Sequence, residues 1–377
     1  MPINVTRVLL FFLLVSAGIS AQSELTPPDN EFLNEFIAGD TTATGERAAA
    51  DRVYVLERGK TYYVRGQFRT QIYPLHIRSA EGDGPRAIIR PSADQEGAIN
   101  AQMIRVYDDA IFEDVHLDGT PFQEGQVRPF RLIRTEGEGS NLTVRNCILT
   151  NAAQALVRVN RAAGTVLFED NIVGNMGDIS RDNLGNGRVV DARGSSIENL
   201  LIEDNTFVNI MDRVVRHRGG SGVIQRMEMN HNTIINHMGY HGFIELGNFG
   251  DSAIITNNLV VDGMTMGSDL PDLERNGEFD SHTERIDTFN KPVWIGSVPN
   301  DSSFFIINEN IYSVSDAVQG FYDARDIDEG ALLTDHIAGK LPDGNVAFEK
   351  AAVEVTTSPA PPIDLMNWYW TPLEDGG

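Results

Sequence analysis

The eight residues VLFEDNIV, Val166–Val173, decide the fold, because the same phrase returns along most of the chain. It reads apolar, any, apolar, any, polar, short polar, and then an apolar pair. The other copies are LTVRNCIL at Leu142–Leu149, LLIEDNTF at Leu200–Phe207, MEMNHNTI at Met227–Ile234, AIITNNLV at Ala253–Val260, FIINENIY at Phe305–Tyr312 and a degenerate AIFEDVHL at Ala110–Leu117. Such alternation is typical of a strand with one buried face.

The spacing of the copies predicts a solenoid. One position of the phrase reads Cys147, Asn171, Asn205, Asn232, Asn258 and Asn310, at spacings of 24, 34, 27, 26 and 52, the last being twice 26. A three-faced β-solenoid has such a period, and its coils bury a core only by stacking. Stacked Asn side chains at one corner also predict an amide ladder in a turn that tolerates left-handed backbone. We therefore expect an all-β chain folded as a right-handed parallel β-helix over residues 53–314.

Other repeat folds fit this pattern less well. Leucine-rich repeats share the period, but their Leu-x-x-Leu-x-Leu signature is absent, and propeller blades need a longer period. An ordinary β-sandwich remains the alternative.

The first 21 residues have the pattern of a secretory signal peptide. Arg7 gives a positive start, Val8–Val15 is apolar, and small residues lead to a cleavage site near Ala21. The alternative is a buried N-terminal helix. No later stretch reaches the ~18 apolar residues of a membrane span. We expect a secreted protein, extracellular or periplasmic, without a membrane span.

The remaining segments flank or interrupt the repeat. Glu31–Ala49 holds apolar residues at loose helical spacing, and residues 22–52 are expected to cap the open end of the solenoid. Gly263–Lys291 is a polar insertion between two coils, and such insertions lie on the surface of solenoids. Residues 315–377 are expected to form a C-terminal extension packed on the solenoid.

The charge limits the class of partner. The formal net charge is −24, and loss of Arg7 with the leader would make it −25, so the average field repels nucleic acid and anionic membranes. The single Cys147 excludes an intrachain disulfide framework. We expect a monomer. Calcium is a possible cofactor at Asp269–Asp280 or Asp323–Glu329, although solvated loops are the alternative, and the metal ligands remain unknown.

A second strand per coil falls between the Asn corners, and its alternation sorts the residues by face. The inward row is Ile104, Ile133, Val157, Val190, Val215, Ile244 and Val293. The next residue of each strand points outward and gives the row Arg105, Arg134, Arg158, Asp191, Arg216, Glu245 and Trp294, followed by an outward row that includes Tyr107, Glu136, Arg193 and Arg218.

Four Arg in one row of an acidic chain suit an elongated anionic ligand, since guanidinium groups match carboxylate and sulfate. The predicted substrate-binding residues are Arg105, Arg134, Arg158, Arg193, Arg216 and Trp294. The alternative is structural, with Arg rows paired to acidic rows, as in Arg134 beside Glu136. Arg218, Tyr240 and His241 are the candidate catalytic residues for handling protons. His217 lies in an inward row, which favours a buried, hydrogen-bonded histidine.

With the coils in register, Arg52–Tyr312 resembles the right-handed β-helix proteins grouped around the chondroitinase-B-type and alginate-type polysaccharide lyases, most of all over Val214–Val261. The resemblance places Arg218 at a basic Lys position, Glu245 at an Arg position and Arg213 at a calcium-ligand position.

The resemblance implies a lyase that cleaves an anionic, uronate-containing polysaccharide by β-elimination. The alternatives are a non-catalytic carbohydrate-binding or cell-surface protein, and a structural or adhesive solenoid without a small ligand. A hydrolase ranks lower, because Asp191 and Glu245 would lie ~10 Å apart with Arg216 between them.

Overall fold

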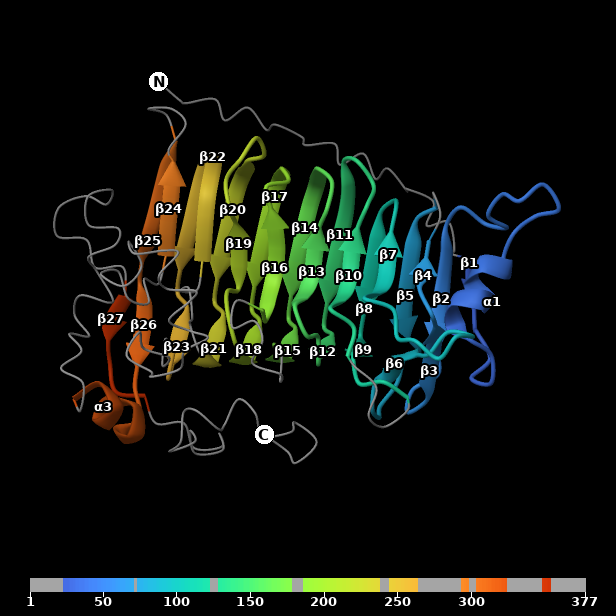
Figure 1. The fold of residues 1–377 in the computed structure, drawn as a ribbon, viewed down its shortest axis with the longest axis horizontal. Helices are drawn as coiled ribbons and strands as arrows, with labels where there is room; N and C mark the ends of the chain where they lie inside the picture. The colour runs from blue at the N-terminus through green and yellow to red at the C-terminus, as the bar shows by residue number, and fades with distance from the viewer. Residues whose placement is uncertain are drawn as a thin grey trace, which may run out of the picture.

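The computed structural model describes residues 23–70, 73–122, 128–177, 186–237, 244–263, 293–297, 303–323 and 348–353, and for 293–297 it describes the backbone alone. The chain forms a right-handed parallel β-helix, as the repeat predicts, with the coils stacked along the long axis of Figure 1. All the strand pairs between successive coils of the described chain are parallel, because each coil returns the backbone to the same direction.

Each coil contributes up to three strands, which stack into three ladders. Sheet 1 contains β4 (Phe68–Arg69), β7 (Gln102–Val106), β10 (Arg131–Thr135), β13 (Ala155–Val159), β16 (Arg188–Arg193), β19 (Val215–His217), the first part of β22 (Ile244–Thr256) and β24 (Val293–Ser297).

Sheet 2 contains β1 (Ser23–Leu25), β2 (Arg52–Leu56), β5 (Leu75–Ser79), β8 (Ala110–Glu113), β11 (Ser140–Arg145), β14 (Ala163–Glu169), β17 (Ile197–Glu203), β20 (Ile224–Asn230), the second part of β22 and β25 (Phe304–Asn308). Because β22 runs through both ladders, sheets 1 and 2 form one 17-stranded sheet.

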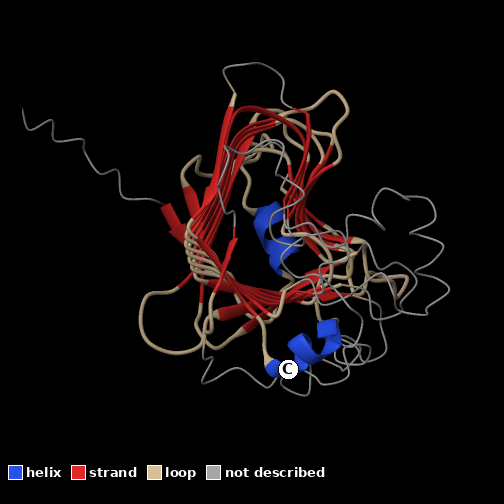
Figure 2. Ribbon diagram, turned by 90° about the vertical axis from the view of Figure 1, so that its left-hand side faces the viewer, coloured by secondary structure: helices blue, strands red, loops and turns tan. Residues whose placement is uncertain are grey.

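Sheet 3 is a separate 10-stranded ladder. Its strands are β3 (Thr61–Arg65), β6 (Ala87–Ser92), β9 (Val115–Asp118), β12 (Ile148–Thr150), β15 (Ile172–Met176), β18 (Thr206–Ile210), β21 (Thr233–His237), β23 (Leu259–Val261), β26 (Asn310–Ser313) and β27 (Phe348–Lys350). Viewed end-on in Figure 2, the strands enclose a three-sided section.

The core is a continuous column of inward side chains. Ile104, Ile133, Val157, Val190 and Val215 pair in register along sheet 1, and all five side chains are buried. Val144, Phe168 and Ile202 do the same on sheet 2. Each coil therefore buries its apolar surface against its two neighbours.

The predicted amide ladder is confirmed at the corner between sheets 2 and 3. The backbone N–H of Cys147 donates to Asn171 Oδ1 at 2.9 Å, and the side chains of Asn171, Asn205, Asn232, Asn258 and Asn310 continue the chain of bonds at 2.9 Å per step. The left-handed backbone belongs to the preceding residue, with φ between +50° and +59° at Asn146, Asp170, Asp204, His231 and Asn257. Short polar residues adopt this conformation at low cost.

Both ends of the described solenoid carry added elements. Helix α1 (Leu33–Gly39) buries Leu33 and Ile37 against the first coils, and in Figure 2 it lies across the three-sided section. Strand β1 precedes α1 and extends sheet 2 into the segment expected to be a cap. At the other end, β27 pairs with β26, so part of the C-terminal extension joins sheet 3, while helix α3 (Asp316–Asp323) lies outside the section.

In the part of the chain that the structure describes, no helix has both the length and the apolar character needed to cross a bilayer. The proposed signal peptide, residues 1–21, lies outside that part.

Candidate anion-binding face on sheet 1

The outward row of sheet 1 stacks as its alternation predicts. Backbone pairing places Arg69, Arg105, Arg134, Arg158, Asp191, Arg216, Glu245 and Trp294 in one column along the solenoid. Arg69 is a member that the repeat alone did not reveal, because β4 is only two residues long. The Trp294 side chain lies outside the described residues. Parallel strands hold successive members ~4.8 Å apart.

The column is open at one end and covered in its middle. Arg69 is exposed, and Arg105 and Arg134 keep about a fifth of their side-chain surface, 22% and 23%. Arg158 and Arg216 are buried, with 6% and 3% of the residue exposed. Among the described side chains of the row, the arginines are therefore most accessible at its N-terminal end.

At the open end, Glu136 takes up part of the positive charge. Its Oε1 lies 2.7 Å from Arg134 Nε and 3.7 Å from Arg105 Nη1, and its Oε2 accepts a hydrogen bond from Asn160 Nδ2 at 2.7 Å. The alternative that the arginine is paired with an acidic residue of the protein is therefore correct for Arg134 and Glu136.

In the covered middle, Asp191 is an internal counter-ion for three guanidinium groups. Its carboxylate is fully buried, and Oδ2 lies 2.5 Å from Arg158 Nη2, 3.6 Å from Arg216 Nη1 and 3.8 Å from Arg188 Nη1. Burial, together with the neighbouring positive charge of Arg188, lowers the pKa of Arg216 to about 9. One carboxylate does not balance three desolvated cations.

A second column of charged side chains stands at the start of the same strands. Backbone pairing aligns Gln102, Arg131, Ala155 and Arg188, and Arg213 precedes β19 three residues before Arg216. The repeated pattern Arg-apolar-apolar-charged, as in Arg131–Arg134, Arg188–Asp191 and Arg213–Arg216, is a sequence signal that would have revealed these residues. Arg188 bonds Asp212 Oδ2 through Nε at 3.0 Å.

Arg213 fills the position where the family resemblance puts a calcium ligand. It is 1% exposed, and it lies 2.9 Å from Asp212 Oδ2 through Nη1 and 3.0 Å from Glu245 Oε2 through Nε. A guanidinium supplies positive charge where a cation would need oxygen ligands, so these residues do not fit calcium. The described residues contain no cluster of three or more His, Cys, Asp or Glu suited to a metal. The acidic segment Asp269–Asp280 lies outside them, and so does most of Asp323–Glu329.

His217 is buried and hydrogen-bonded, in agreement with its place in an inward row. Its Nδ1 accepts hydrogen bonds from the backbone N–H of Gly219 at 3.2 Å and Asn248 at 3.3 Å. Burial lowers the pKa of His217, so the ring is neutral at physiological pH. Its role is to hold two turns together.

A β-bulge changes the register where sheet 1 turns into sheet 2. Asp191 pairs with Arg216, but Arg193 then pairs with His217, and Ala192 is the extra residue. The sequence aligned Arg193 with Arg218, one step away. The bulge gives Arg193 a left-handed backbone with φ +53°. All other non-glycine residues with positive φ in the described chain lie in two corner rows and are Asp, Asn, His or Glu.

Arg193 and Arg218 are exposed at this edge. Arg193 lies close enough to Arg131 and Arg158 for its charge to lower their pKa, and Arg218 acts in the same way on Arg188 and Arg216. Within the described part of the chain, Arg131, Arg193 and Arg218 form no ion pair with a carboxylate.

The charge balance of this face opposes that of the whole protein. Strands β7, β10, β13, β16 and β19, with the one residue that follows each, contain eight Arg (105, 131, 134, 158, 188, 193, 216, 218) and two carboxylates (Glu136, Asp191), a net of +6. The chain as a whole carries −24. Sheet 1 is therefore a locally basic face that can attract and hold an elongated anion.

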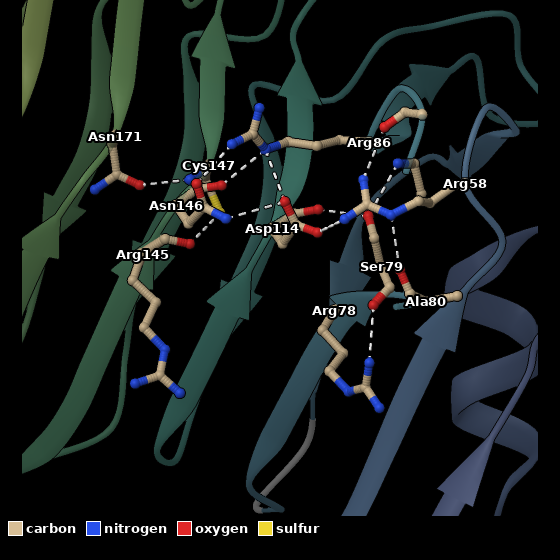
Figure 3. Close-up of polar contacts among 12 residues, drawn as sticks. Arg58, Arg78, Ser79, Ala80, Arg86, Asp114, Arg145, Asn146, Cys147 and Asn171 are labelled. Carbon is tan, nitrogen blue, oxygen red and sulfur yellow. Dashed lines mark hydrogen bonds and ion pairs between the residues drawn. The ribbon is translucent and has the colours of Figure 1, made fainter. Parts of the chain in front are cut away.

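A second charged cluster, at the corner drawn in Figure 3, has a different character. Asp114 contacts Arg58 Nη2 and lies 3.0 Å from Arg86 Nε, while Arg86 also donates to the Asn146 carbonyl at 2.9 Å and to Asn146 Oδ1 at 2.6 Å. Arg58 donates through Nε to the Ala80 carbonyl at 2.8 Å. These N–H groups bond to acceptors within the protein, so the cluster stabilises the corner and leaves few hydrogen-bond donors for a ligand.

The structure thus gathers Arg105, Arg134, Arg158, Arg193, Arg216 and Arg218 on or beside one face. Tyr240 and His241 lie outside the described residues, just before β22. No protein-family model matches the chain, and no curated protein sequence matches it.

Proposed function

We propose that this is a secreted polysaccharide-active protein that binds an anionic, uronate-containing polysaccharide along sheet 1. The excess of Arg on strands β7 to β19, eight against two carboxylates, carries the proposal. A solenoid presents these cations at regular ~4.8 Å steps, which suits a polymer with repeated anionic groups. Arg69, Arg193 and Arg218 are exposed, and Arg105, Arg131 and Arg134 are partly exposed.

The reaction that we propose at this face is β-elimination. It requires positive charge beside the uronate carboxylate, so that the carbanion formed when the C5 proton leaves is stabilised. We assign this role to Arg218, and its exposure beside the turn held by His217 supports the assignment. Arginine stays protonated and is a poor base, so proton removal falls to Tyr240 or His241.

Non-catalytic binding is the second candidate, and one observation favours it. His217, the histidine within β19, uses Nδ1 to accept two backbone hydrogen bonds and is fully buried, which removes it from proton transfer. Both candidates share the binding face and differ in turnover alone.

The deciding assay mixes the purified protein with alginate, chondroitin, dermatan, pectate and ulvan, with calcium and with chelator. Absorbance in the band of unsaturated uronates reports elimination, and a separate equilibrium measurement reports binding. We expect one polymer to give a rise that Arg218→Ala abolishes, while Arg226→Ala, an exposed arginine on sheet 2, retains it. Saturable binding with a flat trace would select the non-catalytic candidate. No binding to any of these polymers would contradict the proposal.

A further inference from the structure

Three arginines at the centre of sheet 1 converge. Arg131 Nη2 and Arg158 Nη2 both donate to the same oxygen, Gln154 Oε1, the second at 3.0 Å. Between Arg131 and Arg188 in the second column stands Ala155, whose side chain carries no charge and fills little space. The guanidinium groups of Arg131 and Arg158 therefore lie side by side around a neutral acceptor.

Arg193 completes the group from the opposite end of the strand. It is the last residue of β16, and its charge is within range of Arg131 and Arg158. Its left-handed backbone is unfavourable for a long side chain, and Gly194 stands next to it. Backbone strain that persists beside a glycine is typical of a residue held for function.

The three cations are not balanced from within the protein. Arg158 shares Asp191 with Arg188 and Arg216, and in the described chain Arg131 and Arg193 have no carboxylate partner. The Nε atoms of Arg131 and Arg158 are buried without a hydrogen-bond acceptor. Burial and the charges of Arg158, Arg134 and Arg193 lower the pKa of Arg131 to about 10, and the charge of Asp191 opposes this only in part. Positive charge in excess of its counter-ion is therefore concentrated at one point of the face.

We propose that Arg131, Arg158 and Arg193 form a subsite for one oxyanion of the ligand, a uronate carboxylate or a sulfate ester. This deepens the proposed function and rests on it for the polymer, but not for the anion. In this subsite an oxyanion accepts hydrogen bonds from the free N–H groups of Arg131 and Arg158 on the sheet, and Arg193 binds it from the edge of the sheet. The bulge at Ala192 shifts Arg193 by one position relative to the next strand.

The first test uses inorganic sulfate and thermal unfolding of the whole protein. We expect sulfate to stabilise the wild type saturably, and Arg131→Ala and Arg193→Ala to weaken its binding about tenfold or more. Arg226→Ala, which removes an exposed arginine from sheet 2, should bind sulfate as the wild type does. Without sulfate, Arg131→Ala should unfold at the wild-type temperature or above, because it removes one of several like charges. A structural role predicts a lower temperature.

The second test identifies the natural oxyanion with unsulfated chondroitin and chondroitin sulfate. If the subsite takes carboxylate, Arg131→Ala weakens binding of both polymers; if it takes sulfate ester, only the sulfated polymer is affected. Wild-type binding of both polymers by Arg131→Ala and Arg193→Ala would overturn the subsite and leave the proposed function standing. Sulfate binding that needs Arg131, with no polymer bound by any variant, would leave the subsite and remove the proposed function.

Discussion

Asp191→Ala tests whether the covered middle of the arginine column is an electrostatic centre. The substitution removes the carboxylate that lies 2.5 Å from Arg158 Nη2 and 3.6 Å from Arg216 Nη1. Arg188 keeps Asp212 at 3.0 Å. In the described chain, Arg158 keeps the neutral Gln154 as its hydrogen-bond partner, and Arg216 keeps no carboxylate within ion-pair distance.

The expected cost is about 3–5 kcal/mol of unfolding free energy, because removal of one partner leaves buried charges without compensation. Arg158 and Arg216 are both more than nine-tenths buried, so solvent does not replace the lost carboxylate. Glu113→Ala is the control. It breaks an ion pair with Arg145, whose side chain is 46% exposed, and a 3.1 Å contact with His76 Nε2, and such surface pairs contribute about 0–1 kcal/mol each.

Chemical denaturation in the presence and absence of sodium acetate measures both variants. We expect Asp191→Ala to recover stability as acetate rises, since a bound carboxylate stabilises by RT ln(1 + [L]/Kd), or about 2.7 kcal/mol at one hundred times Kd. Glu113→Ala should not respond. Equal, small losses in the two variants would refute the idea that Asp191 neutralises this centre.

Four further outcomes follow from the same structure. Asn232→Ala should destabilise by about 2–4 kcal/mol, since it leaves the buried Asn205 backbone N–H without its acceptor and removes two side-chain steps of the ladder, whereas Asn199→Ala on the half-buried outer face should cost under about 1 kcal/mol by denaturation. Gly247→Ala would place Cβ 2.0 Å from Gly219 N and shift the turn beside Arg218, so ligand affinity and the free energy of unfolding should both fall. Gly39→Ala, with open space around it, should change neither the binding nor the unfolding measurement. Burial lowers the pKa of His237 to about 3, so this histidine stays neutral when folded and charges first in the unfolded chain. His237 alone should make stability fall by about 1.4 kcal/mol per pH unit between pH ~6.5 and ~3, and His237→Gln should flatten the measured slope. Chelator should leave polymer binding unchanged if Arg213 takes the place of a cation, and lost binding would contradict that assignment.

The stacking register could be predicted from the sequence because two independent periodicities fix it. Alternation assigns each residue of a short strand to a face, and the Asn at one corner sets the start of each coil. Together they predict the alignment of Arg105, Arg134, Arg158, Asp191 and Arg216, and backbone pairing confirms it. A second amide row, Asn175 to Asn209 to Asn236, was missed, although each member follows a ladder Asn by four residues.

The parts that the sequence did not predict depend on contacts between distant segments. Ala192 and Arg193 fit a regular strand equally well, so the alternation of apolar and polar residues does not reveal the bulge that moves Arg193 by one position. Burial of Arg158 and Arg216 depends on which other residues cover sheet 1, and alternation distinguishes only inward from outward. Arg131 and Arg188 begin their strands at a corner, where the two-residue period does not assign a face.

The cost of the basic face is the strongest reason to connect it with a ligand. Burial, and after it the repulsion of neighbouring arginines, lowers the pKa of Arg131 and Arg216, and a protein with net charge −24 has no need of these cations for solubility. At the corner near Asp114, by contrast, Arg58 and Arg86 bond to acceptors within the protein. On sheet 1, Asp191 and Glu136 leave most of the positive charge unbalanced, and a left-handed Arg193 adds to it. A stable solenoid would lose energy by such an arrangement unless an anion from outside supplies the missing charge, which is why we propose binding, rather than support of the fold, as the role of these arginines.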